Sequence, residues 1–285
     1  MQGPCQVGKG WPSREHRKGV ATEYESLNIE RRDHIAIVRL NRPEKLNVLS
    51  IELRKELENV VDEFQDDTDA RVVILTGAGD NFSAGIDLKD PKRDALAQEP
   101  LLVQQRLYQQ GQRLIRKFHE MRQITIAAIN GFALGGAACI VSALDFRVGA
   151  DDCSVGYPEI NLAMNLSWFG LPLCVRLVGP ARAKRFVILG QRENAQTLLE
   201  WGFLDEVVPK DRLMERALEL AEQYAAQPPM VAQMIKRSVN VISSALDEAV
   251  MHMDTDQLLL AATSEDYREG MRAFLNKRRP DFTGR

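Results

Sequence analysis

The sequence predicts an α/β fold with a largely parallel β-sheet, followed by a helical region at the C-terminal end. Apolar runs of strand length alternate with amphipathic helical segments through about residue 150. These runs are continuously apolar, which is typical of parallel strands covered by helices on both faces. Beyond about residue 178 the apolar residues recur at helical spacing only.

Four segments are predicted strands, because each is an apolar run bounded by polar or turn-forming residues. They cover residues 34–40, 71–77, 123–129 and 145–149. The first ends at Asn41-Arg-Pro43, and the second ends at the turn Gly77-Ala-Gly79-Asp80.

Helical spacing of apolar residues predicts the helices between and after these strands. Ser50 can cap the first helix, in which apolar residues recur from Ile51 to Phe64. A long helix is expected at about 102–121, and the glycine-rich residues 134–144 are interpreted as a closely packed, buried helix. Further helices are predicted at 180–189, 194–201, 212–227 and 230–243, with a last one that ends near residue 277.

The composition argues against several other classes of protein. With 45% hydrophobic residues among 285, the chain is too apolar to be disordered, and its net charge of −3 offers no general attraction for nucleic acid. No apolar run approaches the roughly 18 residues that span a bilayer. The four cysteines and four histidines are scattered, with neither a disulfide framework nor zinc-ligand spacing. We expect a cytoplasmic protein without a metal and without a nucleic-acid or membrane partner.

Two glycine-containing loops that follow predicted strands are candidates for binding an oxygen atom. They are FSAGIDL at 82–88 and NGFALGGA at 130–137, and the second opens into a helix. Small residues permit the close approach of a ligand, and a helix N-terminus offers unpaired N–H donors. Either loop alone is also compatible with a tight turn and close packing. Together, the two loops could aim two N–H groups at one oxygen, as in an oxyanion hole.

Glu159 is the candidate acid or base. It lies in an apolar stretch with Pro158, Ile160, Leu162 and Met164, where loss of hydration would raise its pKa, as a proton shuttle requires. The alternative interpretation is a surface glutamate after a turn.

At these residues the sequence resembles the enoyl-CoA hydratase/isomerase (crotonase) superfamily. The segments SAGIDL (83–88), NGFALGGA (130–137) and PEINL (158–162) are similar to its three core motifs. Further matches in the family's order are RPEKLNVL (42–49), VGPARAKR (178–185), WGFLDEVVP (201–209) and EGMRAFLNKR (269–278). The resemblance therefore spans about residues 23–282.

The resemblance implies an organisation for the whole chain. Residues 22–200 would form a crotonase-like spiral of ββα units, and residues 201–285 a C-terminal helical trimerisation region. The assembly would be a homotrimer or a hexamer made of two trimers. Residues 1–21 are polar and rich in glycine and proline, and they lack the apolar stretch of a secretory signal. We predict that they are a disordered N-terminal extension.

The resemblance also implies an acyl-CoA thioester substrate, with coenzyme A as part of that substrate and no separate cofactor. The backbone N–H groups of Ile86 and Gly136 would form the oxyanion hole, and Glu159 would move the proton. The coenzyme A moiety would lie on backbone near Lys45, Ala84 and Leu88, while Phe274 and Lys277 would reach the coenzyme A of a neighbouring subunit. The basic residues of 272–285 would suit a 3′-phosphate, or would form a solvated tail.

The sequence departs from the family's hydratase pattern on one side of the predicted site. Hydratases of this family hold water between two carboxylates, and the first of these is replaced here by Cys139. A buried thiol stays protonated and substitutes poorly for a carboxylate, so we interpret Cys139 as a packing residue rather than a nucleophile. Ser167 occupies the position whose backbone orders the hydratase water, and Trp168 replaces a small residue. We expect Cys139, Ser167 and Trp168 to reshape the acyl pocket, although an aromatic residue that merely packs is equally compatible.

Losing one carboxylate affects the possible reactions differently. Adding water across a double bond needs a base and an acid, whereas moving a double bond from position 3 to position 2 needs one group that carries a proton from C2 to C4. We therefore predict enoyl-CoA isomerisation by Glu159. The alternatives are hydration with Glu159 alone, and a catalytically weak member of the family that binds acyl-CoA.

Overall fold

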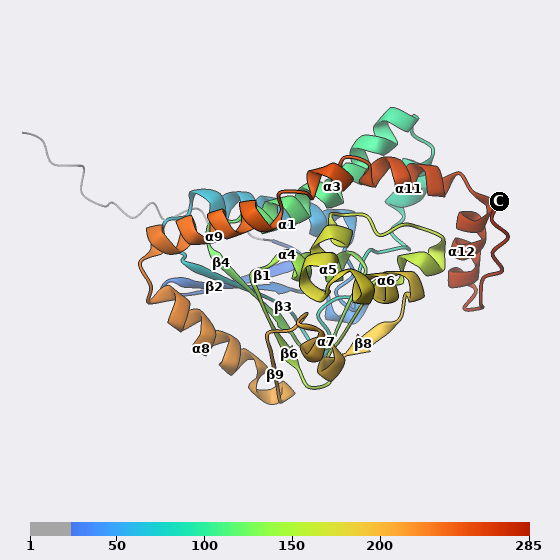
Figure 1. Ribbon diagram of the computed structural model, residues 1–285. Helices are drawn as coiled ribbons and strands as arrows, with labels where there is room; N and C mark the ends of the chain where they lie inside the picture. Colours follow the sequence, from blue (N-terminus) through green and yellow to red (C-terminus); the bar gives the residue numbers. More distant parts are fainter. Residues whose placement is uncertain (1–23) are drawn as a thin grey trace, which may run out of the picture.

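A six-stranded sheet forms the centre of the molecule in the computed structural model, which describes residues 24–285 (Figure 1). Its strand order is β1-β2-β3-β4-β6-β9, and only β1 and β2 pair antiparallel. The strands are β1 (Leu27–Arg32), β2 (Ile35–Leu40), β3 (Val72–Gly77), β4 (Ile124–Ile129), β6 (Phe146–Ala150) and β9 (Glu206–Val208). The four predicted strands are confirmed, while β1 and β9 were not predicted. The predicted extension at 1–21 lies outside the described residues.

A second, smaller sheet lies beyond the carboxyl ends of the parallel strands. It consists of β5 (Phe132–Leu134), β7 (Ser154–Gly156) and β8 (Arg192–Asn194). Isolated bridges join Leu49 to Ile86 and Ser83 to Ala133, so the loops after β3 and β4 continue this layer. Loops that follow successive parallel strands are thereby brought to one edge of the central sheet, where α/β proteins place their ligands.

Helices cover both faces of the central sheet. Figure 1 shows α1 (Ile51–Asp66) and α3 (Leu101–Glu120) on one side and α8 (Leu213–Ala225) on the other. The other helices before the C-terminal arm are α2 (Lys92–Ala97), α4 (Gly136–Ala143), α5 (Gly170–Val178), α6 (Pro180–Leu189) and α7 (Ala195–Trp201). Short 3₁₀ turns lie at η1 (Pro43–Lys45), η2 (Pro158–Leu162) and η3 (Lys210–Arg212). Most predicted helices are confirmed, but α2 and α5 were not predicted.

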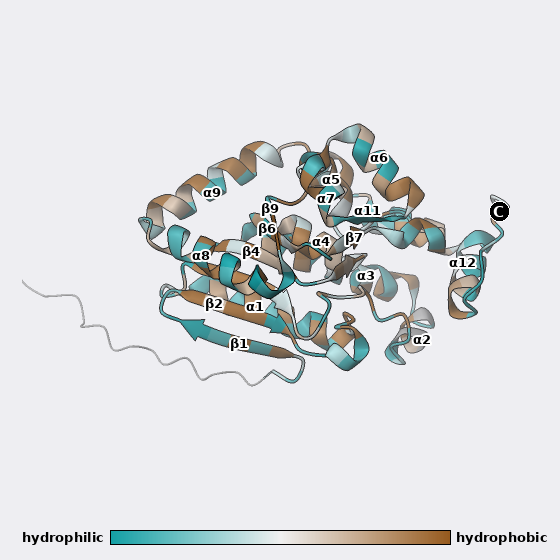
Figure 2. Ribbon diagram, turned by 90° about the horizontal axis from the view of Figure 1, so that it is seen from below, coloured by the Kyte–Doolittle hydropathy of each residue, from teal (hydrophilic) through white to brown (hydrophobic). Residues whose placement is uncertain are grey.

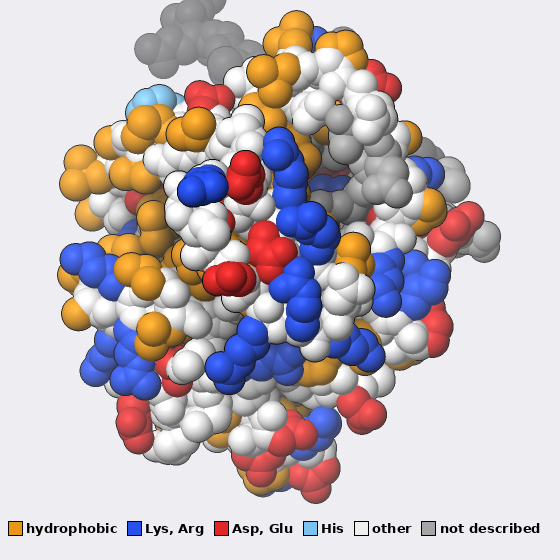
Figure 3. Space-filling model, turned by 90° about the vertical axis from the view of Figure 1, so that its right-hand side faces the viewer, with side chains coloured by type: hydrophobic (Ala, Val, Ile, Leu, Met, Phe, Trp, Pro, Cys, Tyr) orange, Lys and Arg blue, Asp and Glu red, His pale blue; other side chains and the backbone are white. Residues whose placement is uncertain are grey.

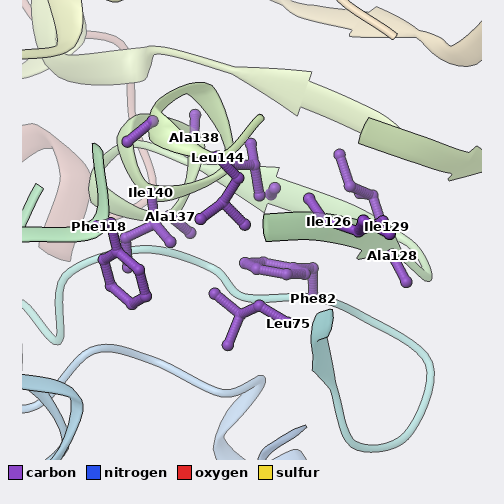
Figure 4. Close-up of a cluster of buried hydrophobic side chains, with 14 of the residues drawn as sticks. Leu75, Phe82, Phe118, Ile126, Ala128, Ile129, Ala137, Ala138, Ile140 and Leu144 are labelled. Atoms are coloured by element: carbon purple, nitrogen blue, oxygen red, sulfur yellow. The ribbon is translucent and has the colours of Figure 1, made fainter. Parts of the chain in front are cut away.

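The core fixes the position of α4, whose residues are all buried because its sequence GAACIVSA is almost entirely apolar. Figure 4 shows Leu75 and Phe82, from β3 and the loop after it, close to Ile126 and α4. All of these side chains are buried. The N-terminal end of α4 is therefore anchored in the hydrophobic core.

The C-terminal part comprises α9 (Pro229–Ser243), α10 (Glu248–Met251), α11 (Asp254–Ala262) and α12 (Glu265–Leu275). Residues after 200 also contribute to the core, because β9 joins the central sheet and α8 packs on it, while the division of the chain at residue 200 stays a prediction. Figure 2 shows hydrophobic segments along α9, where Met234, Val239 and Ile242 are exposed. That exposed face suits an oligomer interface, and the trimer stays a prediction. None of the described helices has the length and apolar character needed for a membrane crossing.

Candidate active site

A cavity of about 1110 Å³ opens at the edge where the loops meet. It contains all three residues predicted to do chemistry, together with most of those predicted to hold coenzyme A. The residues from both sets that line it are Lys45, Ala84, Ile86, Leu88, Gly136, Glu159 and Phe274.

Main-chain hydrogen bonds hold the two glycine-containing loops side by side. The N–H of Ser83 donates to the carbonyl of Phe132 at 3.0 Å, and the N–H of Leu134 donates to the carbonyl of Ser83 at 3.1 Å. Further along the first loop, Leu49 donates to Gly85 at 2.8 Å and Asp87 donates to Leu49 at 3.3 Å. Sheet-like pairing of the main chain therefore holds the two loops together, and the side chain of Asn130 adds hydrogen bonds to the carbonyls of Gly77 and Gly79.

Gly85 and Gly135 permit this close approach. Gly85 has φ +86°, and a Cβ atom there would lie 2.4 Å from the carbonyl oxygen of Leu134. Gly135 has φ +55°, and its N–H donates to the carbonyl of Gly156 at 2.9 Å. Both residues adopt a backbone that side chains disfavour, and at Gly85 the contact itself excludes a side chain.

Two backbone donors on the cavity wall are left unpaired. The N–H groups of Ile86 and Gly136 donate to no acceptor within residues 24–285. Hydrogen bonds through Gly85 and Asp87 engage the groups on either side of Ile86, and Gly136 is the first residue of α4. A helix begins with unpaired N–H groups and a partial positive charge, so the pair is suited to an oxygen that acquires negative charge.

Glu159 faces the same space from η2, directly after β7. Its Oε2 atom is buried and has no hydrogen-bond partner among the described residues. A Cβ atom on Gly135 would lie 3.0 Å from its Oε1 atom, so the carboxyl group lies next to the residue that precedes Gly136. Burial raises the pKa of Glu159 from 4.5 to about 7. A carboxyl group with that pKa can both take and return a proton near neutral pH.

The last helix, α12, packs against the segment that carries Glu159. A Cβ atom on Gly270 would lie 2.8 Å from the backbone of Leu162, so α12 approaches η2 closely. This packing brings Phe274 to the cavity of its own chain. Its contact with the coenzyme A of a neighbouring subunit stays a prediction. Lys277 is exposed and does not line the cavity.

Charged side chains form part of the cavity lining. The basic residues in its lining are Arg42, Lys45, Lys89, Lys92 and Arg192, and the acidic ones include Glu44, Glu52, Asp87 and Asp90. Figure 3 shows a band of Lys and Arg side chains, with acidic side chains beside it, on the side of the molecule that carries α12. Sequence reasoning missed Arg42 and Arg192. Each lies at or near a turn, and the presence of a basic residue there is the only local feature of the sequence that could have indicated a role in binding.

A family model described as enoyl-CoA hydratase/isomerase matches residues 30–285. The chain belongs to the enoyl-CoA hydratase/isomerase family. The short-chain-enoyl-CoA hydratase of Clostridium acetobutylicum is 29% identical over 259 residues, which cover 90% of this chain and 97% of that protein. The 1,2-epoxyphenylacetyl-CoA isomerase of Escherichia coli is 33% identical over 248 residues, or 86% of this chain and 94% of that protein.

Solved structures agree with this family assignment. The crystal structure of an enoyl-CoA hydratase from Bacillus anthracis superposes with a TM-score of 0.71 at 32% identity, covering 92% of this chain and all of that chain. The predicted crotonase-like fold is therefore confirmed, and the protein is an enzyme of the enoyl-CoA hydratase/isomerase family.

The residues that depart from the family's hydratase pattern lie behind the cavity wall. Cys139, Ser167 and Trp168 are absent from its lining, although the sequence predicted them there. Cys139 is buried, its thiol donates to the carbonyl of Ser167 at 3.8 Å, and burial raises its pKa well above the ordinary value. Cys139 is therefore a protonated packing residue, as expected. The sheltered position of all three depends on how α5 packs on α4, which sequence patterns do not specify.

Proposed function

We propose that this enzyme moves the double bond of an enoyl-CoA thioester from position 3 to position 2. The observation that carries the proposal is the carboxyl group of Glu159, whose buried Oε2 atom has no partner among the described residues, beside two unpaired backbone donors. A buried thiol, Cys139, stands where hydratases of the family have their other carboxylate.

The two donors supply the electrostatic part of the reaction. Removing a proton from C2 of the thioester gives an enolate whose negative charge develops on the carbonyl oxygen. The N–H groups of Ile86 and Gly136 would hold that oxygen, and each well-placed donor contributes roughly 2.7–4 kcal/mol. Both donors are backbone groups fixed by the pairing of the two loops, so little reorganisation is needed when the charge forms.

Glu159 would perform both proton transfers. The ionised carboxylate takes the proton from C2, and the electrons pass into the dienolate held at the two amides. The neutral carboxyl group then returns the proton at C4, which leaves the double bond between C2 and C3 and restores the carboxylate. A pKa of about 7 suits both states of this cycle.

The part of the cavity lined by Lys45, Ala84 and Leu88 would take the coenzyme A moiety. Further basic residues, among them Arg42 and Arg192, belong to the same lining. Guanidinium and ammonium groups are the usual partners of phosphate groups. This charge distribution supports a thioester that enters with its acyl group toward Glu159.

Hydration of a 2-enoyl-CoA with Glu159 alone is the second candidate. The name of the Clostridium acetobutylicum relative favours it, because that protein is a hydratase. A water molecule on Glu159 would have to supply both the nucleophile and the proton. A protein that binds acyl-CoA without turnover is the remaining alternative, and the raised pKa of Glu159 argues against it.

Rates of isomerisation and hydration, measured on matched 3-enoyl- and 2-enoyl-CoA thioesters, distinguish these functions. We expect isomerisation to be the faster reaction, and Glu159→Gln to lower it roughly 10²–10⁴-fold with acyl-CoA affinity near normal. Glu193→Gln is the matched control, because Glu193 pairs with Arg185 and lies outside the cavity lining. Faster hydration would favour the second candidate, and an unchanged rate in Glu159→Gln would exclude the proposed mechanism.

A further inference from the structure

The indole of Trp168 fills the space behind the second backbone donor. Trp168 is only 5% exposed and lies between Gly111 of α3 and Gly136 of α4. A Cβ atom on Gly111 would lie 1.8 Å from Cε2 of the indole, and one on Gly136 would lie 2.8 Å from Cζ3. Any side chain at either position would collide with the ring, so both glycines make room for it.

The chain adopts an unfavourable backbone to place this ring. Trp168 and Phe169 have φ values of 59° and 63°, in the left-handed region that bulky residues rarely occupy. Asp254 of α11 stabilises the turn, because its buried carboxylate accepts a hydrogen bond from the N–H of Phe169 at 3.0 Å. Such strain persists only where the surrounding structure holds it, and it is concentrated at functional sites.

The indole also stands where the cavity ends. Gly136 lines the cavity, whereas Trp168 and Gly111 behind it do not. The ring packs against the α4 end of the site, and Arg54 of α1 lies over the ring, 5.7 Å from its centroid. Beyond Gly136, where an acyl group could extend deeper, the space is occupied by an aromatic ring held from three helices.

We propose that Trp168 limits the length of the acyl group that this enzyme accepts. The proposal rests on the proposed function, in which the thioester carbonyl lies at Ile86 and Gly136. A short acyl group would end in front of the indole, and further methylenes would find no apolar space to occupy. Replacing the indole by a small side chain would open such space between α3 and α4.

Affinities for saturated butanoyl-, octanoyl- and dodecanoyl-CoA test this limit without requiring turnover. Each newly buried methylene strengthens binding about fourfold. In the wild-type enzyme we expect little gain in affinity from butanoyl- to dodecanoyl-CoA. In Trp168→Ala the ratio of the two affinities should shift at least tenfold toward dodecanoyl-CoA, and Trp168→Phe should give a smaller shift. Thermal unfolding shows which variants are folded. If Trp168→Ala does not fold, the affinity ratio is measured in Trp168→Phe and Trp168→Leu instead.

Phe169→Ala is the matched control. Phe169 is buried in the same turn with the same backbone conformation, but its ring packs under Arg116, and no glycine of the site makes room for it. We expect it to leave the affinity ratio unchanged. An unchanged ratio in folded Trp168 variants, or a fourfold gain per methylene in the wild-type enzyme, would overturn the proposal. A shifted ratio together with full isomerisation by Glu159→Gln would sustain the length limit and refute the proposed mechanism instead.

Discussion

The carboxyl group of Glu159 lies against Gly135, where a Cβ atom would come within 3.0 Å of Oε1. The N–H of Gly135 also donates to Gly156, three residues before Glu159. Gly135 thus contacts the segment that carries Glu159 and directly precedes Gly136, whose N–H is unpaired among the described residues. The contacts of Gly135 therefore contribute to the spacing between the proposed proton carrier and the proposed oxyanion donor.

The rate of isomerisation should depend on pH through Glu159. Because the carboxyl group must be ionised to take the proton from C2, kcat/KM should rise with pH and reach half its maximum near pH 7. Initial rates between about pH 5 and pH 9 measure this. Glu193→Gln should retain the profile, and a rate that does not change over this range would show that Glu159 is not the base.

Replacing Glu159 should stabilise the protein above neutral pH. Burial raises the folded-state pKa from 4.5 to about 7, so the folded protein holds this proton more tightly than the unfolded chain does. The carboxyl group's contribution to the free energy of unfolding is full below about pH 4.5 and falls as pH rises to about 7. Above that pH the buried charge costs about 3 kcal/mol, at 1.36 kcal/mol per pKa unit. Denaturant unfolding at pH 5 and pH 8 measures the free energy of unfolding of Glu159→Gln and of the wild-type protein. The variant should exceed the wild type by more at pH 8 than at pH 5, and an equal difference at both pH values would contradict the raised pKa of Glu159.

Gly85→Ala should abolish most activity, whereas Gly179→Ala should not. Both glycines have a strongly positive φ, so alanine strains the backbone at either position, at a cost of about 1–3 kcal/mol of stability. Only at Gly85 would the new Cβ atom collide with a neighbour, the carbonyl of Leu134, while nothing lies within 4 Å at Gly179. Moving Gly85 moves the N–H of Ile86, and a displacement of about 1 Å can lower the rate 10²-fold. Steady-state rates and unfolding curves of both variants check this, and similar rates would mean that the contact does not position the donor.

Cys139→Glu should destabilise the protein without creating a hydratase. The thiol is buried, and a Cβ atom on Gly170 would lie 2.7 Å from Sγ, so the site has no room for a longer side chain. Overpacking costs about 1–3 kcal/mol, and a buried carboxylate adds to that. Cys139→Ala is the control and should stay active. Increased hydration by Cys139→Glu would mean that position 139 reaches the cavity after all.

Local patterns sufficed for the buried strands and the glycine-containing loops, because continuous apolar runs and clustered glycines are read directly along the chain. They failed for β1, whose sequence LNIERR is largely polar because the strand lies at the edge of the sheet. Three-residue strands such as β8 and β9 are too short to give a periodic signal.

The sequence predicted that Ile86, Gly136 and Glu159 share one site, and all three line the same cavity. It did not predict which other elements pack around that cavity. Phe274 reaches its own chain's cavity only because α12 packs on η2, a contact between segments about 100 residues apart. The position of Trp168 depends on Gly111, a glycine inside an otherwise regular helix. An isolated glycine in a helix indicates close packing, so Gly111 could have been noticed in the sequence. The sequence around it did not indicate that the indole of Trp168 is the group that packs there.

Both proposed oxyanion donors belong to the polypeptide backbone, and this has a consequence for how the site can change in evolution. Any amino acid except proline supplies an N–H at position 86, so the side chain there is free to drift without removing the donor. The residues least able to vary are the neighbouring Gly85 and Gly135, whose backbone conformations disfavour any side chain. Inherited loss of activity in this protein should therefore be found beside the reacting groups as readily as at them.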